Sequence, residues 1–310
     1  MKRLPLKHLQ RICQKPDHRR IGNFYARRVA RPLALRVTWV VLPWGISAHV
    51  MTLAAWLVAI AAAIAFGWGT VGGWLLGAGL LQLWYLLDHV DGQLARARGT
   101  ASLDGVQLDY LMHHTVNLVL PVGIGMGLFV RRLEPLWIVI GLVWGTAALL
   151  LRLRHDATYK AFFQRFKRLR GTLVVVGGGG GRPIPPVSPP HEPRRFAVWC
   201  VHKLSEIHVV INALTVIAIT HWALEDRSLS VGAIYTAMMA TLVFALLVAT
   251  LVRSLVRQEA EQQFAAWFRP PRGCDLVYND GWWELVDCET AQTTHEAATS
   301  FLESRDHLDR

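Results

Sequence analysis

The chain has 310 residues, 53% of them hydrophobic, and a formal net charge of +11 at pH 7. Soluble globular domains are about 45–50% apolar, and the apolar residues here form runs long enough to cross about 30 Å of hydrocarbon. These properties exclude an ordinary soluble protein and indicate an integral membrane protein. The basic residues gather between the apolar runs, eleven of them ahead of Ala48 and eleven from Arg152 to Lys203, which is typical of cytosolic loops and argues against nucleic acid as the partner.

The N-terminal segment is basic and contains an amphipathic pattern. Basic and apolar residues alternate at helical spacing over residues 18–44, which predicts a helix lying in the membrane interface. Prolines interrupt this segment, so it does not have the pattern of a signal peptide. We therefore assign residues 1–48 to a cytosolic N-terminus with an amphipathic interfacial helix.

The apolar runs that follow predict an all-α membrane domain over residues 49–255. Six membrane-spanning helices are expected, at about 50–66, 71–87, 105–130, 136–151, 209–224 and 231–252. The connections on one side of these helices hold most of the basic residues, whereas those on the other side are short and nearly free of them. By the positive-inside rule, both termini lie in the cytosol.

Two further segments differ in composition from the membrane domain. Residues 153–205 form a long cytosolic loop with a glycine run and a proline-rich stretch, a composition typical of linkers. From 258 to 310 eleven acidic residues stand against four basic ones, so residues 256–310 are expected to be an acidic cytosolic tail. The four cysteines are scattered and indicate neither a metal knuckle nor a disulfide framework.

Acidic residues interrupt the apolar pattern at the cytosolic end of the second predicted helix and the start of the third. Asp88 and Asp91 are three residues apart, and Asp109 and His113 are four apart, so each pair lies on one helical face. Helices joined by a short loop pack as antiparallel neighbours, which brings the two pairs together. Carboxylates this close repel one another unless a cation binds, and oxygen-rich sites suit Mg²⁺, Mn²⁺ or Ca²⁺.

Neighbouring residues fit the binding of a phosphate-containing ligand. Gly92 and Gly105 have no Cβ, so a bulky ligand can approach the backbone there. Arg96 provides a fixed positive charge suited to phosphate. Asp104 is a candidate N-cap for the third helix.

The spacing of these residues resembles the signature of the CDP-alcohol phosphotransferase family, D-x2-D-G-x2-A-R-x8-G-x3-D-x3-D. The match in type and spacing comprises Asp88, Asp91, Gly92, Ala95, Arg96, Gly105 and Asp109. The last position differs, since the family has aspartate where this chain has His113. The resemblance covers about residues 20–255 and leaves out the acidic tail.

The resemblance implies transfer of a substituted phosphate from a CDP-linked donor, with CDP-diacylglycerol the expected donor, to an alcohol acceptor with release of CMP. It implies two divalent ions, Mg²⁺ or Mn²⁺, held by Asp88, Asp91 and Asp109. It also implies a cytidine and pyrophosphate site lined by Gly92, Ala95, Arg96 and Gly105. A homodimer in the bacterial inner (cytoplasmic) membrane, with the active site in contact with the cytosol, follows from the same resemblance.

His113 leaves three alternatives open. A neutral imidazole can act as the general base on the acceptor hydroxyl. It can also ligate a metal and favour Mn²⁺ over Mg²⁺, or its presence can mark a site that has lost activity. The corresponding alternatives for function are a soluble CDP-aminoalcohol donor with a lipid alcohol acceptor, and a non-catalytic membrane homologue.

Overall fold

The computed structural model describes residues 5–14, 22–176 and 191–287. The glycine run and the proline-rich stretch predicted as a linker lie outside the described residues, and so do the first residues of the predicted interfacial helix. The chain divides into two compact units, Met1–Leu153 with Pro186–Thr250, and Arg154–Pro185 with Leu251–Arg310. We describe each unit by itself.

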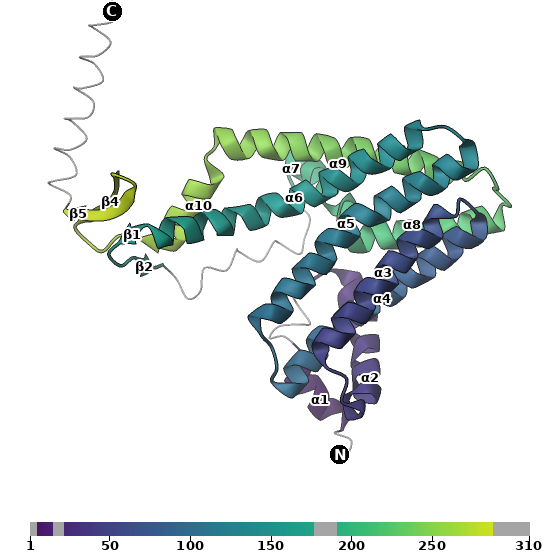
Figure 1. The fold of residues 1–310 in the computed structure, drawn as a ribbon, viewed down its shortest axis with the longest axis horizontal. Helices are drawn as coiled ribbons and strands as arrows, with labels where there is room; N and C mark the ends of the chain where they lie inside the picture. The colour runs from purple at the N-terminus through teal and green to yellow at the C-terminus, as the bar shows by residue number, and fades with distance from the viewer. Residues whose placement is uncertain (1–4, 15–21, 177–190, 288–310) are drawn as a thin grey trace, which may run out of the picture. The chain divides into compact units, whose positions relative to one another are not determined.

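Within its described residues, the regular elements of the first unit are all helices (Figure 1). Two of its helices, α6 and α9, continue into the second unit. Its helices are α1 (Leu6–Cys13), a π-helical turn (Ala26–Ala30), α2 (Arg31–Val41), a 3-10 turn (Leu42–Trp44), α3 (Ala48–Gly67), α4 (Val71–Arg98), α5 (Leu103–Arg132), α6 (Leu136–Lys167), α7 (Pro193–Leu204), α8 (Ile207–Ala223) and α9 (Ser230–Val256).

Four of the described helices are long and apolar enough to cross a membrane, namely α3, α5, α6 and α9. The helix α8 is apolar but shorter, with 17 residues. In α4 the apolar segment contains several glycines and Gln82, and the remainder carries the charged motif. The prediction of a helical membrane protein is therefore confirmed, and the count of six spans stays a prediction.

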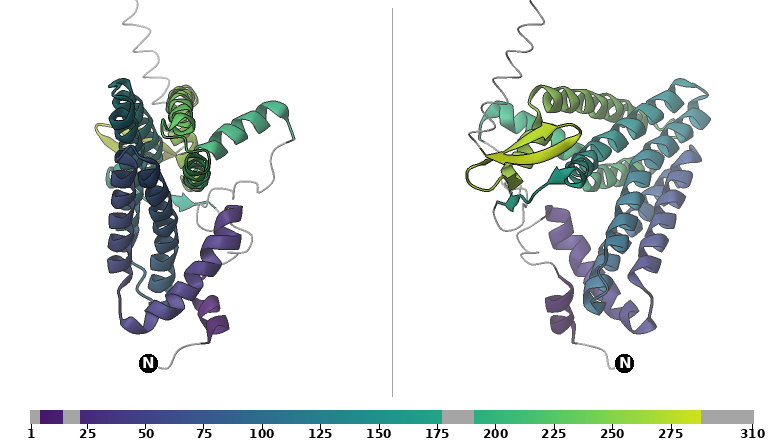
Figure 2. Two further views of the ribbon diagram at one scale, coloured as in Figure 1. Left: turned by 90° about the vertical axis from the view of Figure 1, so that its right-hand side faces the viewer. Right: turned by 60° about the vertical axis from the view of Figure 1, so that its left-hand side comes forward.

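Close backbone contact holds α5 against α3. A Cβ at Gly127 of α5 would overlap the carbonyl oxygen of Phe66, and one at Gly123 would overlap that of Ala63. Small residues four apart on a helix allow this approach, which is a common way for membrane helices to pack. The helix α3 packs against both α4 and α5, and through it the two motif helices are held relative to each other (Figure 2).

Replacing Gly127 by alanine is expected to destabilise the first unit. The added methyl group must displace the Phe66 carbonyl, and overpacking of this kind costs about 1–3 kcal/mol. Thermal unfolding followed by circular dichroism should show a lower midpoint for the variant. Gly79→Ala is the matched control, because a Cβ at Gly79 of α4 meets nothing within 4 Å; an unchanged midpoint for Gly127→Ala would contradict the packing described.

A chain of partly buried polar groups ties the N-terminal segment to α4 and α8. The Tyr25 hydroxyl donates to Oε1 of Gln82 at 2.5 Å. The amide nitrogen of Gln82 in turn donates to Asn212 Oδ1 at 3.2 Å and to Thr215 Oγ1 at 2.9 Å. Because buried polar groups require partners, these bonds fix the rotation of α4 between the N-terminal segment and α8.

The second unit combines the end of α6 with α10 (Glu259–Trp267) and short strands. The strands are β1 (Leu169–Arg170), β2 (Val174–Val175), β3 (Phe268–Arg269), β4 (Cys274–Asn279) and β5 (Trp282–Asp287). The sheet order is β1-β5-β4, with β1 parallel to β5, and β2 pairs with β3. The β4–β5 hairpin turns at Asp280 and Gly281, both at positive φ, as a two-residue hairpin turn requires. Part of the predicted acidic tail is thus folded onto the end of α6.

Candidate functional site

The motif lies on two long helices with a short connection between them. The helix α4 continues past the predicted end at Asp88 and stops at Arg98, because Gly99 adopts a left-handed conformation at φ +67° that favours glycine. The helix α5 then starts after Ser102, whose hydroxyl accepts a hydrogen bond from the Gly105 N–H at 3.1 Å. Ser102 is the N-cap, and Asp104 lies in the first turn of the helix instead.

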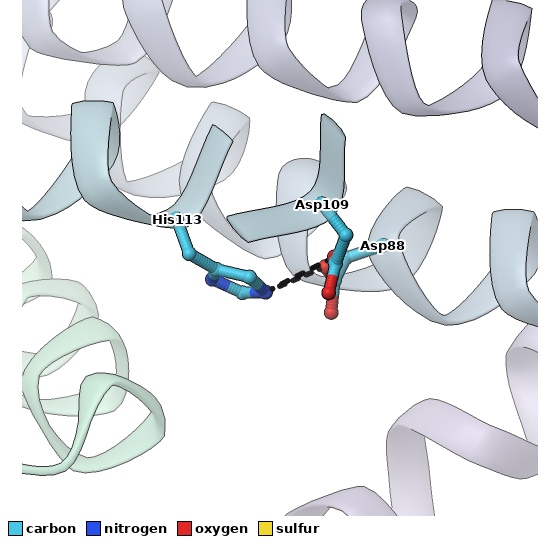
Figure 3. A group of neighbouring side chains, drawn as sticks. All are labelled: Asp88, Asp109 and His113. Carbon is cyan, nitrogen blue, oxygen red and sulfur yellow. Dashed lines mark ion pairs between the residues drawn. The ribbon is translucent and has the colours of Figure 1, made fainter. Parts of the chain in front are cut away.

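Three of the four residues predicted to bind metal come together between these helices. Figure 3 shows the side chains of Asp88, Asp109 and His113 pointing toward one another. The Nε2 atom of His113 lies 3.1 Å from Asp88 Oδ1 and 3.4 Å from Asp109 Oδ1. The pairing across the helices and the pairing within α5 therefore meet at one imidazole nitrogen.

The chemistry of this trio fits a divalent cation. One ligand atom from each of the three residues lies within 4.8 Å of the others. Two carboxylates and an imidazole form a mixed oxygen and nitrogen donor set, which divalent transition-metal ions accept. Asp88 is largely buried whereas Asp109 is partly exposed, so the cluster is accessible from one side.

Asp91, the remaining predicted ligand, is held by a different contact. Its side chain is buried, and its Oδ2 accepts a hydrogen bond from the Thr52 hydroxyl of α3 at 2.7 Å. Its Oδ1 accepts from the Gly92 N–H. Asp91 therefore borders the same cavity as the trio but with its orientation set by α3.

Removing the Thr52 hydroxyl is expected to destabilise the protein and to release Asp91. In Thr52→Val the buried carboxylate loses a partner at 2.7 Å, and an unsatisfied buried group of this kind costs about 1–3 kcal/mol. Thr52→Ser keeps the hydroxyl and serves as the control. A thermal unfolding midpoint that falls for valine and recovers for serine is the expected result; equal midpoints would mean that the hydrogen bond contributes nothing.

Arg96 is anchored by the N-terminal helix. Its Nε donates to the carbonyl oxygen of Cys13, at the end of α1. Its guanidinium lies over Gly92, where an added Cβ would be 3.2 Å from Nη1. Arg98, by contrast, donates to the carbonyl oxygens of Leu42 and Ile46 and secures the chain ahead of α3.

These residues line a single cavity of about 420 Å³. All of the predicted site residues border it, namely Asp88, Asp91, Gly92, Ala95, Arg96, Gly105, Asp109 and His113. It also has lining residues that the sequence did not single out as site residues, among them Gln14, Arg31, His49, Thr52, His89 and Gln93. Gln14 and Arg31 lie ahead of the first predicted span, His49 and Thr52 lie at its start, and His89 and Gln93 lie among the motif residues of α4. No fixed spacing in the sequence marked them as site residues.

Comparison with solved structures gives low-identity matches to phosphatidylinositol phosphate synthase from Mycobacterium tuberculosis. The form with CDP-DAG bound has 18% identity and a TM-score of 0.44, covering 72% of this chain and 92% of that one. The complex with manganese and citrate has 17% identity and a TM-score of 0.45, covering 70% and 88%. A comparison with curated protein sequences gave no match.

The family comparison covers the segment that contains the entire motif. Residues 45–177 match the family model described as CDP-alcohol phosphatidyltransferase. This range holds both motif helices, the trio and the Thr52–Asp91 hydrogen bond. Residues 45–177, which are 133 of the 310 residues, therefore match the CDP-alcohol phosphatidyltransferase family, and this match supports a CDP-alcohol phosphotransferase enzyme.

Proposed function

We propose that this enzyme transfers the phosphatidyl group of CDP-diacylglycerol to an alcohol acceptor and releases CMP. The observation that carries the proposal is the cluster of Asp88, Asp109 and His113, which borders one cavity with Asp91 and Arg96. Two of the helices that form this cavity, α3 and α5, are long and apolar enough to cross a membrane. A donor with a water-soluble nucleotide and two acyl chains suits a polar cavity between helices of this kind.

The carboxylates are proposed to hold the divalent ions. Asp88 and Asp109 contribute oxygens from the trio, and Asp91, which lies outside the trio but lines the same cavity, is proposed to add an oxygen from the neighbouring turn of α4. Both Asp91 oxygens already accept a hydrogen bond, yet each keeps a further lone pair for a cation. When bound, Mg²⁺ or Mn²⁺ ions neutralise charge on the attacking and leaving oxygens of a phosphoryl transfer.

His113 is proposed to take the proton of the acceptor hydroxyl. Its Nε2 is the ring atom directed into the cluster, so in the neutral tautomer with Nδ1 protonated it is the accepting atom. Asp88 and Asp109 stabilise the imidazolium that results, because opposite charges at 3.1 and 3.4 Å attract. The histidine thereby performs the role that an aspartate has in the family signature.

Gly92, Ala95 and Gly105 are proposed to leave room for the cytidine and pyrophosphate, with Arg96 beside them. An added Cβ at Gly105 would lie 3.3 Å from His49 Nε2, and one at Gly92 would crowd the Arg96 guanidinium. The absence of side chains at these two positions keeps the cavity open between α3, α4 and α5. Ala95 adds the smallest side chain compatible with a strong helix.

We also propose the six-span topology with the active site and both termini in the cytosol of a bacterial inner membrane. In support, α4 packs against α3, which is long and apolar enough to span a membrane, and α8 packs against α4. These contacts would place α4 and α8 in the membrane beside α3. The described helix over 24–44 keeps the basic and apolar alternation expected of an interfacial helix. The homodimer stays a prediction from the family resemblance.

A product assay tests the function. Purified protein in detergent is incubated with Mg²⁺ or Mn²⁺, labelled CDP-diacylglycerol and a panel of alcohols and alcohol phosphates, and CMP and labelled lipid are measured. Release of CMP together with a new phospholipid is expected. Turnover only with a CDP-aminoalcohol and diacylglycerol would support the reversed arrangement, and no turnover with any pair would contradict the proposal.

A further inference from the structure

The cavity has a second arginine, which comes from outside the family-matched residues. Arg31 is the first residue of α2 and lines the cavity together with the trio. The family match starts at residue 45, so its signature includes no residue of α2. The positively charged side chain of Arg31 therefore borders the cavity on the side of α2, and it is not part of the signature motif.

The structure fixes the position of Arg31 at both its backbone and its side chain. The Arg31 carbonyl oxygen accepts a hydrogen bond from the Gln93 amide nitrogen at 3.3 Å. The hydroxyl of Thr38, further along α2, donates to Oε1 of the same Gln93 at 3.1 Å. Its guanidinium lies over Gly22, where an added Cβ would be 2.8 Å from Nη2. Gly22 also has φ +97°, a conformation that favours glycine, so a bare backbone leaves space for the guanidinium.

The charges in the cavity suit a phosphate group that binds together with divalent ions. Arg31 and Arg96 both line the cavity, as do the carboxylates of Asp88, Asp91 and Asp109 that are proposed to hold the ions. With the carboxylates engaged by the ions, the two guanidinium groups are the cations left for the phosphate oxygens. The planar guanidinium matches phosphate oxygens in a bidentate arrangement, so phosphate is the anion that the geometry favours.

We infer that Arg31 binds a phosphate group of a substrate and makes the N-terminal helices part of the substrate site. The inference rests on the proposed function. Two substrates can carry such a group, the diphosphate of the CDP-linked donor and the phosphate of a phosphorylated acceptor. In either case Arg31 binds and orients the phosphate group. The bond that breaks in the proposed reaction is still the one between the transferred phosphate and CMP.

Binding measurements separate the two sources without reliance on turnover. The full-length protein in detergent with Mn²⁺ is titrated with CDP in the first arm, and with inorganic phosphate in the presence of saturating CDP in the second. The variants are Arg31→Gln and Arg31→Lys. Arg36→Gln is the matched control, because Arg36 lies exposed on the same helix and its loss changes the net charge equally.

Arg31→Gln is expected to lower the affinity for CDP or for inorganic phosphate by at least about tenfold, because a charge-assisted hydrogen bond to phosphate is lost. Weaker binding in the CDP arm assigns Arg31 to the donor diphosphate, and weaker binding in the phosphate arm assigns it to the acceptor. Arg31→Lys is expected to lie between the wild type and Arg31→Gln, because it keeps the charge and loses the planar fork. Thermal unfolding of each variant checks the fold, and if Arg31→Gln fails to fold, the lysine variant carries the test.

Binding by Arg31→Gln that equals that of Arg36→Gln in both arms would overturn the inference. If the wild type then still binds CDP and releases CMP, only the inference fails and the proposed function stands. If the wild type releases no CMP with any substrate pair, but it binds phosphate and Arg31→Gln does not, then the proposed function fails and the phosphate site stands. A wild-type protein that binds neither CDP nor phosphate contradicts both.

Discussion

Asp109→Asn is expected to lower CMP release by about a thousandfold while the protein remains folded. Asparagine keeps the shape of the side chain and removes its charge, so the cluster retains one carboxylate and an imidazole of its three groups. Loss of transition-state stabilisation of about 4 kcal/mol, the scale of a bound metal ion's contribution, corresponds to this factor. Manganese binding followed by electron paramagnetic resonance should weaken in parallel with the rate.

Asp104→Asn is the matched control for this experiment. Asp104 lies on the same helix in its first turn, is exposed, and does not line the cavity. Its replacement removes the same charge from α5, so the rate and the manganese affinity should remain near those of the wild type. Equal losses in the two variants would mean that Asp109 acts only through the overall charge of α5, and the metal assignment would then fail.

His113→Ala is expected to reduce the rate by about a hundredfold to ten-thousandfold, the range for loss of a general acid or base. The ring is the group that contacts both carboxylates, with its Nε2 at 3.1 and 3.4 Å from them. Its removal leaves Asp88 and Asp109 without the imidazole between them and deprives the acceptor hydroxyl of its base. The initial rate of CMP release at saturating donor and acceptor measures the effect.

His114→Ala is the control for His113, because His114 is the next residue on α5, stacks against Tyr110 and does not line the cavity. His113→Asp restores the residue of the family signature and distinguishes the roles of the imidazole. A nitrogen ligand favours transition metals relative to Mg²⁺, so a fall in the ratio of the rates with Mn²⁺ and Mg²⁺ in the aspartate variant would assign His113 to the metal, whereas an unchanged ratio is expected for the proposed base. An alanine variant as active as the wild type would exclude His113 from the chemistry.

The sequence predicted the pairs within each helix but not every contact between helices. Asp109 and His113 are one turn apart, and local helix geometry is sufficient to place them on one face. Asp91 is three residues from Asp88 and also shares its helical face, yet its carboxylate is turned to Thr52 of α3. The rotation of α4 relative to its neighbours decided this, and that rotation depends on contacts such as Gln82 with Asn212, which are 130 residues apart.

The boundaries of the helices show the same division. The sequence indicated where the apolar runs lie, but α4 continues to Arg98 because its polar end packs against α1 and α2. Likewise, the parallel pairing of β1 with β5 joins Leu169 to Trp283. Such pairing is a long-range event, and the composition of either segment by itself does not predict it.

By itself, the amino-acid sequence determined that this is a helical membrane protein, and it determined which acidic residues share a helical face. Both properties depend on local quantities, the length of an apolar run and the 3.6-residue period of a helix. Only the tertiary structure decided that Asp88 meets Asp109 and His113, that Thr52 holds Asp91, and that Arg31 closes the cavity. These contacts depend on how α2, α3, α4 and α5 rotate against one another, which close packing at positions such as Gly123 and Gly127 sets.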